Sequence, residues 1–236
     1  MRSSERHQLK ENQFATATQE ILTSASEHRT GLLYGGTALV VVLLLVFGGT
    51  FYLQNREQKA SVLFGQGMQV YNAPVVAEGT PTPPGVTTFT SAEDRAKAAS
   101  NKFVEVVNKY GRTDSGLMAK YFLGICAEDM KDNSKAEQYL KDVSDSRNKE
   151  VASLAKSALA SLYHATGRDQ QAMDIYKALI EKPTNTVPKA SAQMALAEIY
   201  AEKDKTQAKI LYEQIGKENP DSPITNIVNT RMAELK

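Results

Sequence analysis

Cysteine, histidine and tryptophan are scarce in this sequence, and their scarcity excludes several kinds of site. The 236 residues contain one cysteine, three histidines and no tryptophan. Cys126 has no second cysteine to pair with, so an intramolecular disulfide and a multi-cysteine metal site are excluded. A buried, inert thiol is expected there instead. His7, His28 and His164 lack the spacing of metal ligands, and we predict neither a metal site nor a cofactor.

An excess of charge of one sign is also missing. Lys and Arg total 28 against 27 Asp and Glu, which gives a formal net charge of +1. This balance creates no field that would attract nucleic acid, and we predict no nucleic-acid binding. The chain is 42% hydrophobic and 23% charged, which is typical of a folded protein with a core of useful size.

Catalytic motifs are absent as well. The stretch "GQGMQV" supplies Gly65 and Gly67 but no third glycine and no preceding strand, so it does not predict a dinucleotide site. No serine or cysteine lies in a recognisable nucleophile motif. We predict a protein without enzymatic activity. The alternative is a membrane-tethered enzyme that depends on an unrecognised group, with His164 and Glu128 as the residues to test.

One uncharged apolar run, "GLLYGGTALVVVLLLVFGGTFYL", covers residues 31–53. It meets the length of about 20 residues that a helix needs to cross a bilayer, and Tyr34 and Tyr52 suit the two interfaces. We therefore predict a single transmembrane helix in contact with lipid at residues 31–53. A cleaved signal peptide fits less well, because a polar segment of 30 residues precedes the run and no small-x-small cleavage site follows it closely.

The residues that flank this run do not decide its orientation. Arg29 lies on one side and Arg56 and Lys59 on the other, which is too small a difference for the positive-inside rule. Gly31 and Gly35 have the small-xxx-small spacing that packs two membrane helices together, so a homodimer is one alternative and lipid-facing glycine the other.

Four alanines recur at an almost constant interval in the rest of the chain. Ala99, Ala136, Ala172 and Ala208 are 37, 36 and 36 residues apart. Each has a large apolar residue four positions later (Phe103, Leu140, Tyr176, Tyr212) and another three beyond (Val106, Val143, Leu179, Ile215). A small residue lets two helices approach closely, while residues at i+4 and i+7 line the same helical face. The pattern predicts stacked helical hairpins.

The first helix of each hairpin has its own matching set: Leu123-Gly124, Leu159-Ala160 and Leu196-Ala197. Gly111, Pro183 and Pro220 follow the second helices as stop signals. The stretches "LYHATGRDQQAMDIYKALIEKP" and "LAEIYAEKDKTQAKILYEQIGKENP" resemble tetratricopeptide repeats, whose unit is about 34 residues. The predicted fold is all-α, a single transmembrane helix followed by a tetratricopeptide-like helical-hairpin solenoid.

We predict three parts: a polar N-terminal segment at 1–30, the transmembrane helix at 31–53, and the repeat domain at 54–236 with a Pro-rich insert at 73–91. The first helix of the first hairpin is expected to continue from the membrane helix. The insert has four of the eight prolines and is read as a flexible connector or a proline-motif docking site. The N-terminal segment is read as a surface-lying or partly disordered helix, or a docking segment. Residues 223–236 are expected to form a capping helix.

Binding is the activity that such repeats offer. The first helices are expected to line a groove with an apolar end and an acidic end, and its predicted residues are Met118, Tyr121, Ile125, Glu128, Asp129, Ser157, Ser161, His164, Met194 and Glu198. Met and Tyr suit adaptable contact with a peptide. Tetratricopeptide domains that clamp the C-terminal carboxylate of chaperones use Lys and Asn at such positions. This chain has Tyr121, Ile125, Ser157 and Ser161 there, so capture of a carboxylate tail by that route is disfavoured.

The layout as a whole resembles the bacterial membrane-anchored family that includes the ancillary subunit of the SecYEG translocon. This resemblance implies a single-pass inner-membrane protein with its N-terminus in the cytoplasm and its repeats in the periplasm. It also implies a non-catalytic adaptor that links the translocon to periplasmic chaperones or other envelope proteins. The alternatives are a scaffold for envelope assembly or cell division, and a self-associating structural membrane protein.

Overall fold

The computed structural model describes residues 29–81 and 83–235, and most of the N-terminal segment predicted at 1–30 lies outside them. Within these ranges the regular secondary structure is helix, together with one isolated parallel bridge between Val75 and Phe89, which confirms the predicted all-α class. The helices are α2 (Arg29–Tyr71), α3 (Ala92–Tyr110), α4 (Asp114–Asp129), α5 (Asn133–Ser144), α6 (Lys149–Ala165), α7 (Asp169–Glu181), α8 (Lys189–Lys203), α9 (Lys205–Glu218) and α10 (Pro223–Glu234). The chain divides into two compact units, Met1–Asn55 and Arg56–Lys236.

In the first unit, helix α2 contains the apolar run. Every large hydrophobic side chain between Leu39 and Leu53 is exposed. By length and composition this part of α2 can cross a membrane. The helix runs without a break to Tyr71, as predicted for the first helix of the first hairpin.

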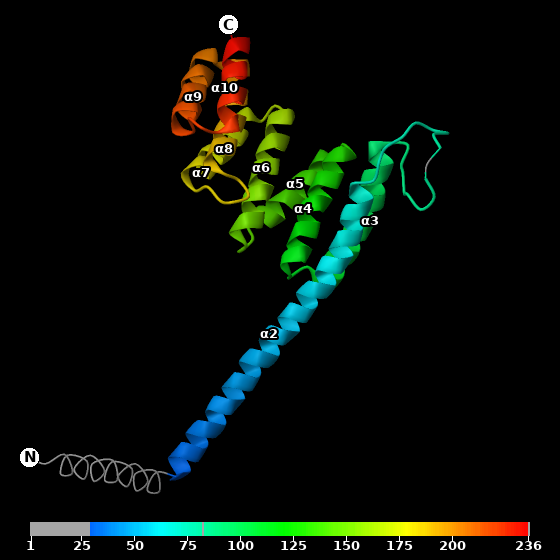
Figure 1. The fold of residues 1–236 in the computed structure, drawn as a ribbon, viewed down its shortest axis with the longest axis vertical. Coiled ribbons are helices and arrows are strands. Elements are labelled where there is room, and N and C mark those ends of the chain that lie inside the picture. The colour runs from blue at the N-terminus through cyan, green and yellow to red at the C-terminus, as the bar shows by residue number, and fades with distance from the viewer. Residues whose placement is uncertain (1–28, 82, 236) are drawn as a thin grey trace, which may run out of the picture. The chain divides into compact units, whose positions relative to one another are not determined.

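In the second unit, each helix from α3 to α10 packs on the next one along the chain, and α4 also contacts α6 (Figure 1). The predicted repeat register is confirmed, because Ala99, Ala136, Ala172 and Ala208 have no exposed surface. The large residues four and seven positions later are also buried, and each is at most 5% exposed. Such a stack joins each hairpin only to its neighbours.

The end of α2 forms part of this stack. The Phe64 ring lies 5.7 Å from the Phe103 ring of α3. Gly67 is the residue that permits this approach, since a Cβ atom there would lie 2.5 Å from Phe103 Cε1.

Two charged residues of α2 hold the turn between α3 and α4. The Arg56 guanidinium donates to the Lys109 carbonyl at 2.7 Å, at the end of α3. The Glu57 carboxylate accepts from the backbone N–H groups of Asp114 and Ser115 at 2.9 and 3.1 Å, at the start of α4. Each charge complements the helix terminus that it meets.

Three equivalent turns join the two helices of the later hairpins. Gly167 in the α6–α7 turn has φ +77°, and Lys131 stands 36 residues earlier in the α4–α5 turn with φ +61°. The α8–α9 turn consists of one residue, Asp204, which follows the end of α8. The Asp204 side chain caps α9 by accepting hydrogen bonds from the Thr206 and Gln207 N–H groups.

The Pro-rich insert is tied at both ends. Val76 N–H donates to the Phe89 carbonyl at 2.9 Å, and Phe89 N–H donates to the Pro74 carbonyl at 3.0 Å. Ser91 then caps α3 through Asp94 N–H. Between these contacts the described residues form turns with no helix.

The predicted capping helix is α10. It packs on α9, and its Val228 is buried with Tyr212 and Ile215 in the last hydrophobic cluster of the stack.

Candidate interaction groove

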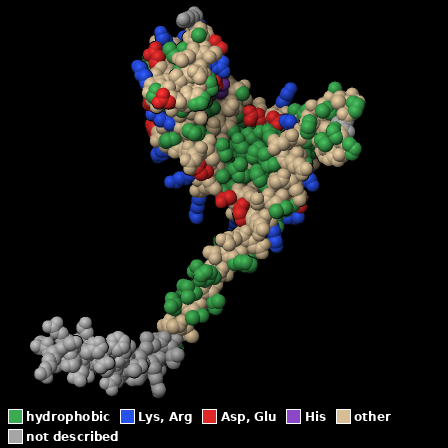
Figure 2. All heavy atoms as spheres, in the orientation of Figure 1, with side chains coloured by type: hydrophobic (Ala, Val, Ile, Leu, Met, Phe, Trp, Pro, Cys, Tyr) green, Lys and Arg blue, Asp and Glu red, His purple; other side chains and the backbone are tan. Residues whose placement is uncertain are grey.

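The apolar part of the predicted groove lies on α4. Met118, Tyr121 and Ile125 are half-buried and pack against the core that α5 to α8 share. Tyr121 meets Phe122 edge to face at 5.2 Å. Figure 2 shows hydrophobic side chains gathered in one patch in the region of α4, with acidic side chains at its margins. Partly exposed aromatic and branched side chains of this kind offer contact area to a protein segment.

The two predicted acidic residues, Glu128 and Asp129, lie at the C-terminal end of α4. Burial raises the pKa of Glu128, and the neighbouring Asp129 charge raises it further. Asp129 Oδ2 and Arg95 Nε are buried without a hydrogen-bond partner. The Arg95 guanidinium lies over the Tyr71 ring, 5.5 Å from its centroid. Asp129 thus belongs to the junction of α4 with the preceding helices.

Cys126 lies at the same junction and is completely buried, as its residue type predicts. Burial raises the pKa of its thiol to about 12, with the Asp129 charge adding to the effect and Arg95 opposing it. The thiol is therefore protonated at neutral pH and is a poor nucleophile.

Some of the residues predicted for the rest of the groove line a cleft of about 450 Å³, which we call the C-terminal cleft. It brings together three of the predicted residues, Ser161, His164 and Glu198. The cleft is lined further by Tyr176, Tyr212, Glu202, Arg231 and Glu234. Its side chains come from five consecutive helices, α6 to α10.

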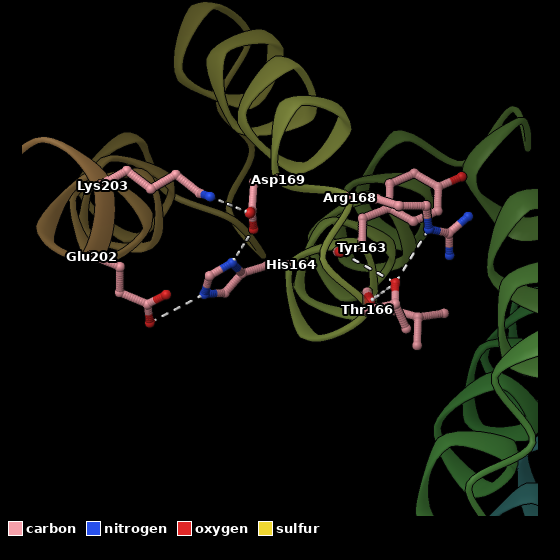
Figure 3. A network of polar contacts seen from close by, with 8 residues as sticks. Tyr163, His164, Thr166, Arg168, Asp169, Glu202 and Lys203 are labelled. Carbon is pink, nitrogen blue, oxygen red and sulfur yellow. Dashed lines mark hydrogen bonds and ion pairs between the residues drawn. The ribbon is translucent and has the colours of Figure 1, made fainter.

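A polar network fixes His164 at the edge of this cleft (Figure 3). His164 Nδ1 lies 2.6 Å from Asp169 Oδ1, and its Nε2 lies 3.6 Å from Glu202 Oε1. Lys203 Nζ bonds the second Asp169 oxygen at 2.6 Å. Lys203 and then His164 lower the pKa of the Asp169 carboxyl. The network joins α6, α7 and α8. These contacts between helices are enough to explain the position of His164, so its position does not point to a catalytic role.

Two further predicted residues, Ser157 and Met194, are not part of the lining of this cleft. The Ser157 carbonyl accepts a hydrogen bond from the Tyr176 hydroxyl at 3.4 Å. Met194 is half-buried against the last hydrophobic cluster. Across 29–81 and 83–235, no group of three or more His, Cys, Asp or Glu side chains has the arrangement of a metal site.

Sequence reasoning missed the contribution of the capping helix. Arg231 of α10 bonds Glu234 at 3.1 Å and lies 3.7 Å from Glu198 of α8. No local pattern discloses this pairing, because it depends on how α10 folds back across the stack. The buried tyrosines Tyr176 and Tyr212 do stand at repeat positions, and the sequence predicts their burial but not their place in the lining of a cleft.

The chain belongs to the tetratricopeptide repeat-like domain family, whose model matches residues 34–182. A second tetratricopeptide repeat model matches residues 191–222. Tetratricopeptide repeats typically form protein–protein interaction modules. A comparison with curated proteins finds no match.

Solved structures of similar fold include two crystal structures from a Podosopora anserina kinesin light chain. Both contain TPR-like repeats that are nearly identical to one another. One, a variant, is 18% identical over 60% of this chain and 77% of its own, with a TM-score of 0.51. The other is 17% identical over 60% of this chain and 78% of its own, with a TM-score of 0.49. At this identity the likeness shows a shared fold alone.

Proposed function

We propose that the protein is a non-catalytic adaptor, anchored in a membrane by residues 31–53, whose first-helix groove binds a segment of a protein partner. The apolar patch of α4 is the observation that carries this proposal. Met118, Tyr121 and Ile125 are half-buried apolar side chains that pack against the shared core and leave part of their surface open. A protein segment laid over them would bury this remaining surface, which favours association.

Two observations support the membrane anchor. The apolar side chains of Leu39–Leu53 are exposed, so a bilayer would remove a large unfavourable surface from water. The family match also begins at residue 34, inside the apolar run, so this helix is part of the family pattern.

The location and partners follow from the resemblance described above. The protein is assigned to the bacterial inner membrane, with its N-terminus in the cytoplasm and its repeats in the periplasm. There the groove would join the translocon to periplasmic chaperones or other envelope proteins. An envelope-assembly or cell-division scaffold would use the same groove with other partners.

Photo-crosslinking in cells tests this proposal. One probe replaces Tyr121 in the apolar patch, and a control probe replaces Lys177, which is exposed on the second helix α7. Translocon or chaperone subunits attached at Tyr121 and not at Lys177 are the expected result. Adducts with cytoplasmic proteins would show that the repeats face the cytoplasm and would contradict the proposed orientation. Adducts only with copies of the same chain would contradict the adaptor function and favour a self-associating membrane protein.

A further inference from the structure

The C-terminal cleft has an unbalanced set of charges. Its described lining includes three carboxylates, those of Glu198, Glu202 and Glu234, and one guanidinium, that of Arg231. His164 adds a positive charge only when it is protonated. At neutral pH the cleft therefore has an excess of negative charge, although the chain as a whole is close to neutral.

Arg231 shows how this cleft receives a cation. Its guanidinium bonds Glu234 at 3.1 Å and lies 3.7 Å from Glu198, so one cation is placed between carboxylates from α8 and α10. Each carboxylate can accept several hydrogen bonds, and neither is saturated by these contacts. Glu198 and Glu234 are 53% and 57% exposed, so an incoming cation can reach them.

The apolar part of the cleft lining suits the stem of a long basic side chain. Tyr176 and Tyr212, which are almost completely buried, line the cleft together with the small side chains of Ala195 and Ala201. Lys and Arg place their methylene groups on apolar surface and keep the charged head at a polar rim. A cleft of about 450 Å³ has room for one such side chain together with neighbouring backbone.

We propose that the C-terminal cleft binds a Lys or Arg side chain of a basic segment in the protein partner, with Glu198, Glu202 and Glu234 as the recognising groups. This inference rests on the proposed adaptor function and specifies the chemistry of its ligand. A segment that reaches from the α4 patch to the cleft combines apolar residues at one end with basic residues at the other. An acidic segment is disfavoured, because its carboxylates would meet three of the same sign.

Peptide binding to the full chain in nonionic detergent micelles tests this proposal. The probes are three fluorescein-labelled dodecapeptides that alternate serine with arginine, with uncharged citrulline or with glutamate. Fluorescence anisotropy at low and high salt gives their affinities. The arginine peptide should bind tightest and should weaken as salt rises, since exposed ion pairs are screened.

Matched variants assign the binding to the cleft. Glu198→Gln with Glu234→Gln should weaken the arginine peptide by about twofold to fivefold for each carboxylate. The control, Glu181→Gln with Glu213→Gln, removes the same charge from exposed positions on α7 and α9 and should change nothing. Arg231→Gln should strengthen binding, because it removes the resident cation that competes for the same carboxylates.

The opposite sign of the Arg231→Gln effect separates recognition from a general loss of structure. Equal affinity for the three peptides, absence of binding, or preference for the glutamate peptide would overturn the proposal. Equal weakening by the cleft and control variants would overturn it as well. If crosslinking at Tyr121 still captures an envelope partner in that case, the adaptor function stands and only the basic-segment specificity is wrong.

Discussion

The close approach of α4 and α5 can be tested with a double-mutant cycle at Gly124 and Leu140. Leu140 is completely buried, and a Cβ atom built on Gly124 would lie 2.8 Å from Leu140 Cδ2. That separation is too short for two carbon atoms, so one of the groups must move. The leucine therefore requires the glycine, and changing either residue alone should disturb the packing.

The magnitudes follow from these contacts. Gly124→Ala overpacks the contact at a cost of about 1–3 kcal/mol and regains about 1 kcal/mol of helix propensity. Leu140→Ala leaves a cavity and should cost about 2–5 kcal/mol. In the double variant the alanine methyl enters the vacated space without a clash. The double variant should therefore be about 1–3 kcal/mol more stable than the sum of the single effects predicts.

Urea unfolding of the full chain in nonionic detergent micelles, followed by far-ultraviolet circular dichroism, measures the four free energies of the cycle. The slopes of the transitions must agree, because a changed slope would signal loss of cooperativity in the repeat stack. Additive effects of the two substitutions would refute the reasoning. A Gly124→Ala variant that gains the full helix-propensity benefit in stability would also contradict the close approach of α4 and α5.

Two further predictions concern the turns and the ion pairs. Lys131→Gly should raise stability by about 0.5–1 kcal/mol because φ is +61° there. Gly167→Ala, at φ +77° with open space around it, should lower stability by about 1 kcal/mol. Unfolding midpoints measure both effects, and effects of the same sign would contradict the left-handed backbone conformation of the two turns. Lys141, with Arg168 and then Tyr163, lowers the pKa of the Glu137 carboxyl from 4.5 to about 2. The stabilisation from Glu137 is thus present above pH 4.5 and lost as pH falls towards 2, so Glu137→Gln should have a flatter thermal-stability profile in that window, and an unchanged profile would contradict it.

The sequence predicts the repeat stack well because its signals are local. A small residue followed by large ones at i+4 and i+7 defines one helical face wherever the helix packs, and Ala172, Tyr176 and Leu179 are buried accordingly. The stop signals at Pro183 and Pro220 act within one turn of the chain. These features require no knowledge of which helix lies opposite.

The candidate site was harder to predict because its contacts join distant parts of the chain. Glu57 caps α4 across 57 residues of sequence, and Arg231 reaches Glu198 across 33. Asp129 was predicted for the groove from its helical face, and the sequence did not show that its charge also raises the pKa of Tyr71 on α2, at a helix junction. Such pairings depend on the angle between helices, which the spacing of apolar residues leaves undetermined.

The stack also implies that the two ends of the groove act through different parts of the protein. The apolar patch around Tyr121 depends on α4 and its neighbours, whereas the C-terminal cleft depends on helices α6 to α10. In a solenoid each hairpin is stabilised by its own packing and by the hairpins beside it. A substitution at Arg231 should therefore alter peptide selectivity without disturbing capture at Tyr121. For a single partner that contacts both ends, the changes in binding free energy caused by a substitution at Arg231 and by one at Tyr121 should then add, because the two contacts lie on separate hairpins.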